Sequence, residues 1–169
     1  MAKSFNTSIK NDITEINNEV IELLDKFRYI SSYKRNYRDL TSQKTYTIDD
    51  NETIEIDDAI SLEKVNEKLK VWVHIASPPA FINYDSALDK LARKRNSSLY
   101  LCNKIEYMFP EIIVDKLFSL KEKENRFAIS IGAIIEDDGQ ISSYEVTKSI
   151  VKPTYRLNYE DADELLDYV

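Results

Sequence analysis

The sequence holds one cysteine, one histidine and no long apolar run. A single thiol, Cys102, cannot form an internal disulfide, and without a CxxC pair there is no cysteine-based zinc site. Such cysteine usage is typical of a reducing, intracellular compartment. No segment approaches the roughly 20 apolar residues that span a bilayer, and the first residues lack the apolar region of a signal peptide. We therefore expect a cytoplasmic protein that does not contact a membrane.

An excess of basic residues is also missing. The chain has 23 Lys and Arg against 30 Asp and Glu, which gives a net charge of −7. Proteins that simply coat nucleic acid are usually basic, so this balance argues against that class. It does not exclude a metal-dependent nuclease, because such an enzyme concentrates carboxylates whose charge the metal then cancels.

The length of 169 residues, 43% of them hydrophobic, suits one domain with a real core. Apolar residues recur at helical spacing from Asn11 to Phe27 and predict an amphipathic helix. Helices are also predicted from Ser86, from Pro110 and from Asn158, where a capping residue or a proline opens each one. Strands are predicted over six further segments, which are 44–48, 59–64, 69–76, 98–101, 126–135 and 140–151.

This mixture of strands and helices predicts an α+β fold with a mixed, largely antiparallel sheet and flanking helices. The Asp138-Gly139 pair between the last two predicted strands is a hairpin signal. We expect residues 1–37 to be an N-terminal extension that is mainly one helix. Residues 38–169 should form the main domain.

An acidic loop between two predicted strands is the most informative segment. It holds six carboxylates within ten positions, namely Asp49, Asp50, Glu52, Glu55, Asp57 and Asp58. Like charges this close repel one another, so the segment is either a solvated loop or a cation site. Ile54 and Ile56 should pull the backbone into the core and leave the carboxylates in a shared space. Mg²⁺ prefers such oxygen ligands.

A calcium-binding EF-hand loop is excluded. That loop needs Gly at its sixth position and Glu at its twelfth. Counted from Asp49, these positions hold Ile54 and Ile60. The residues by themselves leave the metal site and the solvated loop open.

Short motifs around the acidic loop resemble one known family. They are Arg38-Asp39-Leu40-Thr41, Thr47-Ile48-Asp49, Asp57-Asp58-Ala59-Ile60, Val73-His74-Ile75-Ala76, Leu88-Asp89 with Ala92-Arg93, Ser98-Leu99-Tyr100-Leu101, Met108-Phe109-Pro110, Leu117-Phe118-Ser119-Leu120 and Tyr155-Arg156-Leu157. In this order, the set is similar to the N-terminal part of the RNB catalytic domain of RNase II and RNase R exoribonucleases.

The resemblance implies a 3′→5′ exoribonuclease that hydrolyses single-stranded RNA to nucleoside monophosphates. It implies Mg²⁺, with Mn²⁺ as an alternative, bound by Asp49, Glu55, Asp57 and Asp58. Of these, Asp57 is the expected catalytic residue. Tyr100 falls on an aromatic position that stacks on RNA in the family, a contact that tolerates any base. Without the resemblance, Tyr100 would be interpreted as a core residue of a strand.

The sequence departs from the family pattern at two positions beside the site. Glu55 and Ser77 each stand where the family has Asp. Because Mg²⁺ demands near-ideal geometry, the longer Glu55 side chain alters the expected ligand set. The single histidine, His74, lies within an apolar strand and is expected to be structural.

The family's catalytic domain also continues beyond the matching region and there supplies phosphate-binding arginines. One hypothesis is therefore an enzyme segment completed by a second chain. A second is a catalytically inactive truncated RNB fragment that serves as an RNA-binding or partner-interaction module, and a third is a plain metal-binding or structural domain. In each case we expect an exposed apolar patch, with marginal stability or self-association.

Overall fold

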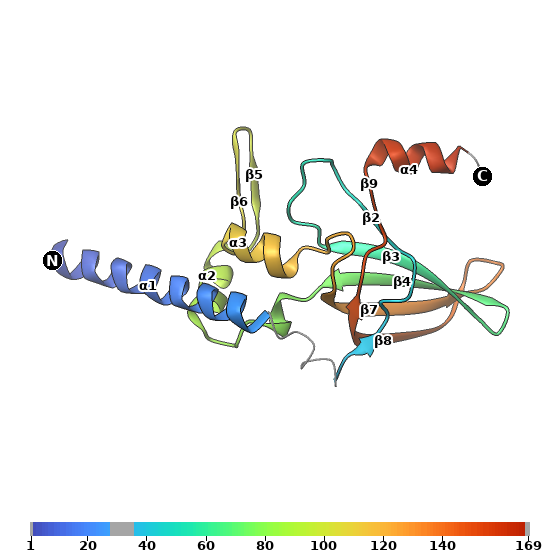
Figure 1. Cartoon of the computed structure of the whole chain (residues 1–169), viewed down its shortest axis with the longest axis horizontal. Helices are drawn as coiled ribbons and strands as arrows, with labels where there is room; N and C mark the ends of the chain where they lie inside the picture. Colours follow the sequence, from blue (N-terminus) through green and yellow to red (C-terminus); the bar gives the residue numbers. More distant parts are fainter. Residues whose placement is uncertain (1, 28–35, 168–169) are drawn as a thin grey trace. The chain divides into compact units, whose positions relative to one another are not determined.

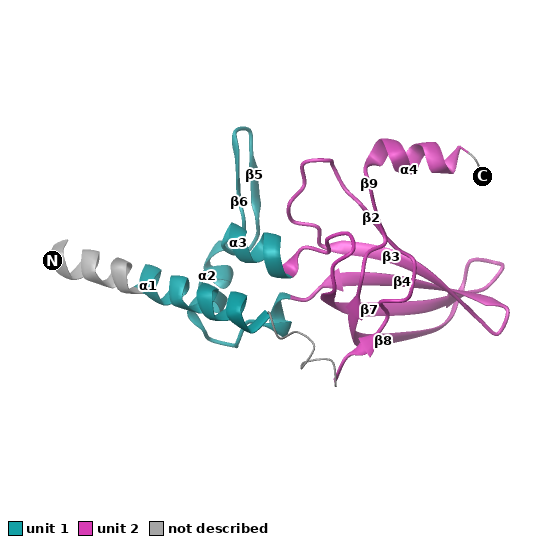
Figure 2. Ribbon diagram, viewed as in Figure 1, with its two compact units in different colours: residues 1–30, 78–117 teal, residues 31–77, 118–169 magenta. Residues whose placement is uncertain are grey.

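The computed structural model describes residues 2–27 and 36–167, with side chains from residue 12 onward. The chain divides into two compact units (Figure 2). Unit 1 comprises residues 1–30 and 78–117, and unit 2 comprises residues 31–77 and 118–169. The expected division at residues 37 and 38 stays a prediction, and the two units are described separately below.

Unit 1 is mainly helical. Its elements are α1 (Ala2–Phe27), a 3₁₀ turn (Pro78–Ala80), α2 (Ala87–Arg95), the hairpin strands β5 (Leu99–Leu101) and β6 (Lys104–Glu106), and α3 (Glu111–Ile113), which continues into a π-helical turn over Val114–Phe118. The expected start of the first helix at Asn11 is wrong, because the helix already begins at Ala2. No Gly or Pro lies before Asn11 to interrupt it.

The start of α2 is capped from two directions. As predicted, the Ser86 hydroxyl accepts a hydrogen bond from the Asp89 N–H at 3.3 Å. The Glu19 carboxylate of α1 also accepts from the N–H groups of Ala87 at 2.7 Å and Leu88 at 3.0 Å. A carboxylate at a helix N-terminus satisfies free N–H groups and complements the helix dipole. These bonds join α1 to α2 within the unit.

Unit 2 is built on a seven-stranded sheet (Figure 1). Its strands are β1 (Arg38–Asp39), β2 (Thr45–Ile48), β3 (Asp58–Val65), β4 (Lys68–Ala76), β7 (Arg126–Ile135), β8 (Ile141–Val151) and β9 (Tyr155–Leu157), followed by the helix α4 (Tyr159–Leu166). The strand order is β1-β8-β7-β4-β3-β2-β9. Only the β1–β8 and β2–β9 pairs are parallel. The predicted α+β class and largely antiparallel sheet are confirmed.

The two long hairpins follow the expected turn chemistry. Gly139, in the turn between β7 and β8, has a φ of 82°, which a glycine adopts without strain. Asn66 and Glu67, between β3 and β4, have φ angles of 48° and 63°. Two residues with positive φ are the hallmark of the type I′ turn that suits two-residue hairpins.

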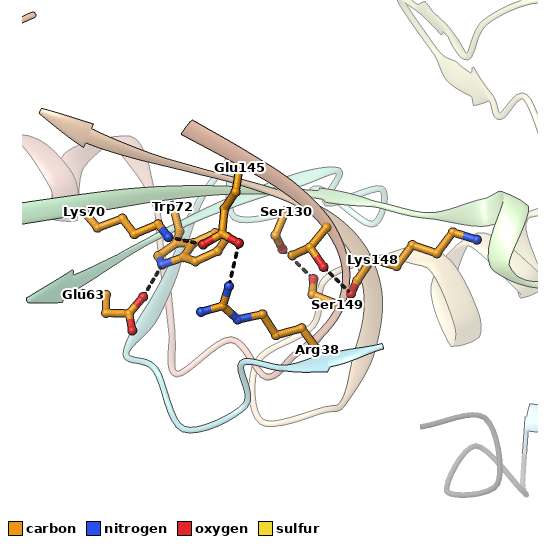
Figure 3. A network of polar contacts seen from close by, with 9 residues as sticks. Arg38, Glu63, Lys70, Trp72, Ser130, Glu145, Lys148 and Ser149 are labelled. Carbon is orange, nitrogen blue, oxygen red and sulfur yellow. Dashed lines mark hydrogen bonds and ion pairs between the residues drawn. The ribbon is translucent and has the colours of Figure 1, made fainter. Parts of the chain in front are cut away.

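The interior face of the sheet carries buried polar side chains, some of which belong to the network of polar contacts in Figure 3. Trp72 is fully buried and lies under two cations, with Lys70 Nζ 4.4 Å and the Arg38 guanidinium 4.9 Å from its ring centre. Both cations also contact the Glu145 carboxylate, and the Trp72 indole N–H donates to Glu63 at 2.9 Å. Lys70, the one buried charge among these residues, is therefore paired with a carboxylate, as burial of a charge requires.

His74 belongs to the same interior face and is fully buried. Its Nε2 lies 2.9 Å from the Ser61 hydroxyl, and its Nδ1 lies 2.6 Å from the Ser130 hydroxyl. Ser61 donates its own proton to the Gln43 side-chain carbonyl at 2.6 Å, so it accepts from His74. This assigns the neutral Nε2–H tautomer, in which Ser130 donates to Nδ1. Burial lowers the pKa of His74 to about 4. The arrangement supports a structural role.

No helix within residues 2–27 and 36–167 combines the length and the apolar character needed to span a membrane.

Candidate metal site in the acidic loop

The acidic loop connects β2 to β3 and is anchored at its centre by a buried side chain. Ile56 is 1% exposed and packs in the core of unit 2 with Leu40, Trp72 and Leu120. Its N–H donates to the Ser119 hydroxyl at 3.2 Å, and its carbonyl accepts from the Leu120 N–H at 2.9 Å. The prediction that Ile56 pulls the backbone inward is confirmed, whereas Ile54 is only half-buried.

The neighbouring backbone of β4 fixes the end of the loop. The Asp57 carbonyl accepts from the Ala76 N–H at 2.7 Å, directly before β3 begins at Asp58. Ser77 follows Ala76 and is buried, and its N–H donates to the Phe127 carbonyl at 3.1 Å. The position at which an acid is missing is therefore held next to the Ala76–Asp57 pairing.

The first half of the loop is held by β9. The Asp49 N–H donates to the Leu157 carbonyl at 3.1 Å. The Arg156 guanidinium donates to three loop carbonyls, those of Asp50 at 3.2 Å, Asn51 at 3.0 Å and Thr53 at 2.8 Å. The loop has no regular strand partner for these carbonyl groups, and the Arg156 guanidinium supplies their hydrogen bonds instead.

Sequence reasoning missed this role of Arg156. Its signal was present in the Tyr155-Arg156-Leu157 motif, but the parallel pairing of β9 with β2 joins segments that lie about a hundred positions apart.

Electrostatics identify a cluster of carboxylates within the loop. Partial burial, followed in order of size by the charges of Glu55, Asp58 and Asp49, raises the pKa of Asp57 to about 6. Asp57 as a residue remains exposed, so the three neighbouring charges are the informative part of this shift. Burial and the Asp58 charge likewise raise the pKa of Asp49, and Arg156 partly opposes them. The four predicted metal-binding residues therefore interact with one another.

These residues match a hard divalent cation in donor type. In the part of the chain that the structure describes, however, no three acidic, histidine or cysteine side chains converge tightly enough to hold a metal ion. The donor set fits Mg²⁺ or Mn²⁺, but holding either ion requires the carboxylates to turn toward a common centre.

Tyr100 lies in β5 of unit 1, whereas the acidic loop belongs to unit 2. Tyr100 is 65% exposed, and its neighbours Leu99 and Leu101 are 49% and 48% exposed. A core role for Tyr100 is therefore wrong. Its assignment as an RNA-stacking residue stays a prediction.

Comparison with known proteins identifies the family. The model of the RNB domain matches residues 37–168. Ribonuclease II of Arabidopsis thaliana chloroplasts and mitochondria is 40% identical over 129 residues, which is 76% of this chain and 16% of that protein. A ribonuclease of Synechocystis is 42% identical over 129 residues, which is 76% of this chain and 19% of that protein.

Solved structures share the fold. Mycoplasma genitalium RNase R in complex with ribose-methylated single-stranded RNA superposes with a TM-score of 0.75 at 23% identity, over 80% of this chain and 21% of that chain. Yeast Ssd1, a pseudonuclease, gives 0.71 at 24% identity, over 78% of this chain and 16% of that chain. The chain spans less than a quarter of each of these four proteins. By its family match and its relatives, the chain belongs to the RNB domain family.

Proposed function

We propose that this chain is the acidic-site segment of a 3′→5′ exoribonuclease, which hydrolyses single-stranded RNA to nucleoside monophosphates with Mg²⁺. The observation that carries the proposal is the geometry of the acidic loop, whose backbone is fixed by Ile56 and Arg156; burial and the charges of Glu55, Asp58 and Asp49 also raise the pKa of Asp57. A cluster that suffers this repulsion gains most from a divalent cation. Relatives named ribonuclease II and ribonuclease R support the reaction class.

Within this proposal, Asp49, Glu55, Asp57 and Asp58 hold the cation. When bound, Mg²⁺ supplies activation of water and stabilisation of the leaving oxygen. Arg156 and Ile56 keep the loop backbone fixed, so the carboxylates need only side-chain rotation to bind. Tyr100 contributes an exposed ring on which a base of the RNA stacks.

RNA binding also needs positive charge, since phosphate contacts dominate affinity for nucleic acid. The net charge of −7 does not supply it. We therefore propose that a second chain carrying the rest of an RNB domain provides the phosphate-binding cations.

An inactive RNA-binding or partner-interaction module is the second candidate. Two observations favour it, the Glu55 and Ser77 departures and the presence of this fold in a pseudonuclease, yeast Ssd1. The longer side chain of Glu55 changes the geometry offered to Mg²⁺, and the neutral hydroxyl of Ser77 removes one negative charge beside the site.

Degradation of labelled RNA distinguishes the two candidates. A single strand labelled at its 5′ end is incubated with the chain, alone and together with a polypeptide that carries the remainder of an RNB domain. Excess Mg²⁺ or excess chelator is present. The enzyme proposal predicts progressive shortening from the 3′ end that depends on Mg²⁺ and releases nucleoside monophosphates.

The matched controls are Asp57→Asn, which removes a proposed ligand, and Asp137→Asn, which changes an exposed aspartate in the β7–β8 turn. Only Asp57→Asn should abolish shortening. Retention of activity in Asp57→Asn, or intact RNA in every mixture, argues for the inactive module.

A further inference from the structure

The face of the sheet opposite the polar interior is apolar and exposed. The strand register places Ile60, Val73, Ile131 and Val146 in one row across β3, β4, β7 and β8. Each of these four residues is between 37% and 59% exposed. The adjacent rows extend the same face through Leu62, Leu69, Ile75, Ile141 and Tyr144, which are 41% to 75% exposed.

This face is broad enough to form an interface. Its nine side chains are each between 37% and 75% exposed and lie on four neighbouring strands, and contiguous exposed apolar patches of more than a few hundred Å² mark interaction sites. The expected exposed apolar patch is therefore present. β-branched and aromatic side chains on a pleated surface also pack well against a second sheet.

Three charges border the face, and they are complementary. Asp58 on β3 and Lys148 on β8 lie in one row with Ile75 and Ile129, next to the row of Ile60, and Lys64 lies at the other end of β3. Lys64 already pairs with Glu67 at 2.8 Å. Among the described residues Lys148 has no ion pair, and Asp58 lies near Asp49 and Asp57 and lacks a cation. The border therefore does not share the strong negative charge of the whole chain.

We propose that this face binds a second copy of the chain and forms a two-fold symmetric dimer. A two-fold axis that runs along the strands, between the facing sheets, exchanges the β3 and β8 sides. It places Asp58 opposite Lys148 of the second copy, and the reciprocal pair forms at the other side. The same axis sets Ile60 against Val146 and Val73 against Ile131.

The argument rests on the sheet register and on exposure, so it does not depend on the proposed function. A second chain that supplies the rest of an RNB domain and binds to this face would displace the second copy. The test therefore uses the full chain alone. It uses a chelator as well, because a cation would compete with Lys148 for Asp58.

Sedimentation velocity over a range of concentrations measures the mass in solution. The wild-type chain should change from monomer to dimer as concentration rises. Ile131→Lys, at the centre of the face, should remain monomeric. Ile112→Lys introduces the same charge at a residue of unit 1 that is 44% exposed, and it should dimerise like the wild type. Circular dichroism confirms that each variant is folded.

A charge exchange tests the orientation of the two copies. Lys148→Glu places like charges opposite each other twice and should raise the dissociation constant roughly tenfold or more. Combining it with Asp58→Lys restores both pairs in reversed order and should return the constant to near the wild-type value. A monomeric wild type at all concentrations, open-ended aggregation, an unaffected Ile131→Lys dimer, or failure of the double variant to recover overturns the proposal.

Discussion

The Arg156 guanidinium donates to the Thr53 carbonyl over 2.8 Å, so a three-residue strand near the end of the chain holds the middle of the acidic loop. Two further carbonyls, those of Asp50 and Asn51, share the same nitrogen. The carboxylates of this loop therefore project from a backbone whose position is set before any ligand arrives. Pre-set backbone lowers the entropy that binding must overcome.

Arg156→Ala should weaken both the loop and its affinity for a cation. It removes hydrogen bonds from a charged donor, and we expect a loss of about 1–2 kcal/mol in the free energy of unfolding. Mn²⁺ affinity, measured by calorimetry, should fall because the carboxylates become mobile. Arg93→Ala is the matched control, since it removes an exposed arginine whose ion pair with Asp89 lies in unit 1. Equal Mn²⁺ affinity in Arg156→Ala and wild type contradicts the proposal that Arg156 holds the loop in place for metal binding.

Asp57→Asn should stabilise the metal-free chain at neutral pH. The folded-state pKa of Asp57, about 6, lies above its ordinary value of 3.8. Between these values the folded chain binds more protons than the unfolded chain, so stability falls as pH rises through this window. Asparagine has no charge to lose and avoids this penalty.

Thermal melting in chelator at pH 7 should therefore give a higher Tm for Asp57→Asn than for the wild type or for Asp137→Asn. Saturating Mn²⁺ should reverse the order of Asp57→Asn and wild type, because only the wild type then gains from binding. A lower Tm for Asp57→Asn in chelator shows that Asp57 makes a stabilising contact instead.

The protonation of the single histidine, His74, reports on the burial of the interior face. Burial lowers the folded-state pKa of His74 from 6.5 to about 4, so the neutral ring contributes stability that is complete above pH 6.5 and lost as pH falls through 4. The contribution is on the order of 3 kcal/mol. Because no other histidine is present, its imidazole resonances can be followed by NMR without assignment ambiguity.

We expect the NMR titration to show an Nε2–H tautomer and no protonation between pH 7 and 5. A midpoint near 6.5 contradicts the buried hydrogen-bonded chain through Ser61 and Ser130.

The two glycines should respond differently to alanine. A Cβ at Gly132 would lie 2.6 Å from Lys70 Cε and 2.8 Å from two atoms of the Trp72 ring, so Gly132→Ala should cost about 1–3 kcal/mol. A Cβ at Gly139 meets open space, but the φ of 82° makes Gly139→Ala strained by about 1 kcal/mol.

Urea unfolding followed by Trp72 fluorescence measures both changes. Only Gly132→Ala should also alter the native emission, because it displaces the indole. Identical native spectra for the two variants contradict the close packing at Gly132.

Local signals in the sequence predict much of the fold. The Ser86 and Asn158 caps, the Asp138-Gly139 turn and the alternation in the long strands each act over a few residues, and the structure contains all of them. The start of α1 and the strand β6 were missed, since no capping residue or pattern marks them. The parallel pairs β1–β8 and β2–β9 depend on long-range register, which short motifs do not encode.

The candidate site likewise has parts that the sequence predicts and parts that it does not. Asp49, Glu55, Asp57 and Asp58 are adjacent in sequence, so their clustering could be predicted, and Ile56 as the anchor followed from its position among them. The hydrogen bonds from Arg156 to the loop could not be predicted, because Arg156 lies on β9, far from the loop in the sequence. The polar interior face was also missed, because it depends on pairing Ser61, His74 and Ser130 across three strands.

Calorimetric titration of the metal-free chain with Mn²⁺ and Mg²⁺ tests the central claim most directly. The acidic loop, as a metal site, predicts saturable binding that Asp57→Asn and Asp58→Asn abolish and that Asp137→Asn leaves unchanged. No measurable binding, or equal binding by the wild type and Asp57→Asn, contradicts the account and leaves a solvated loop.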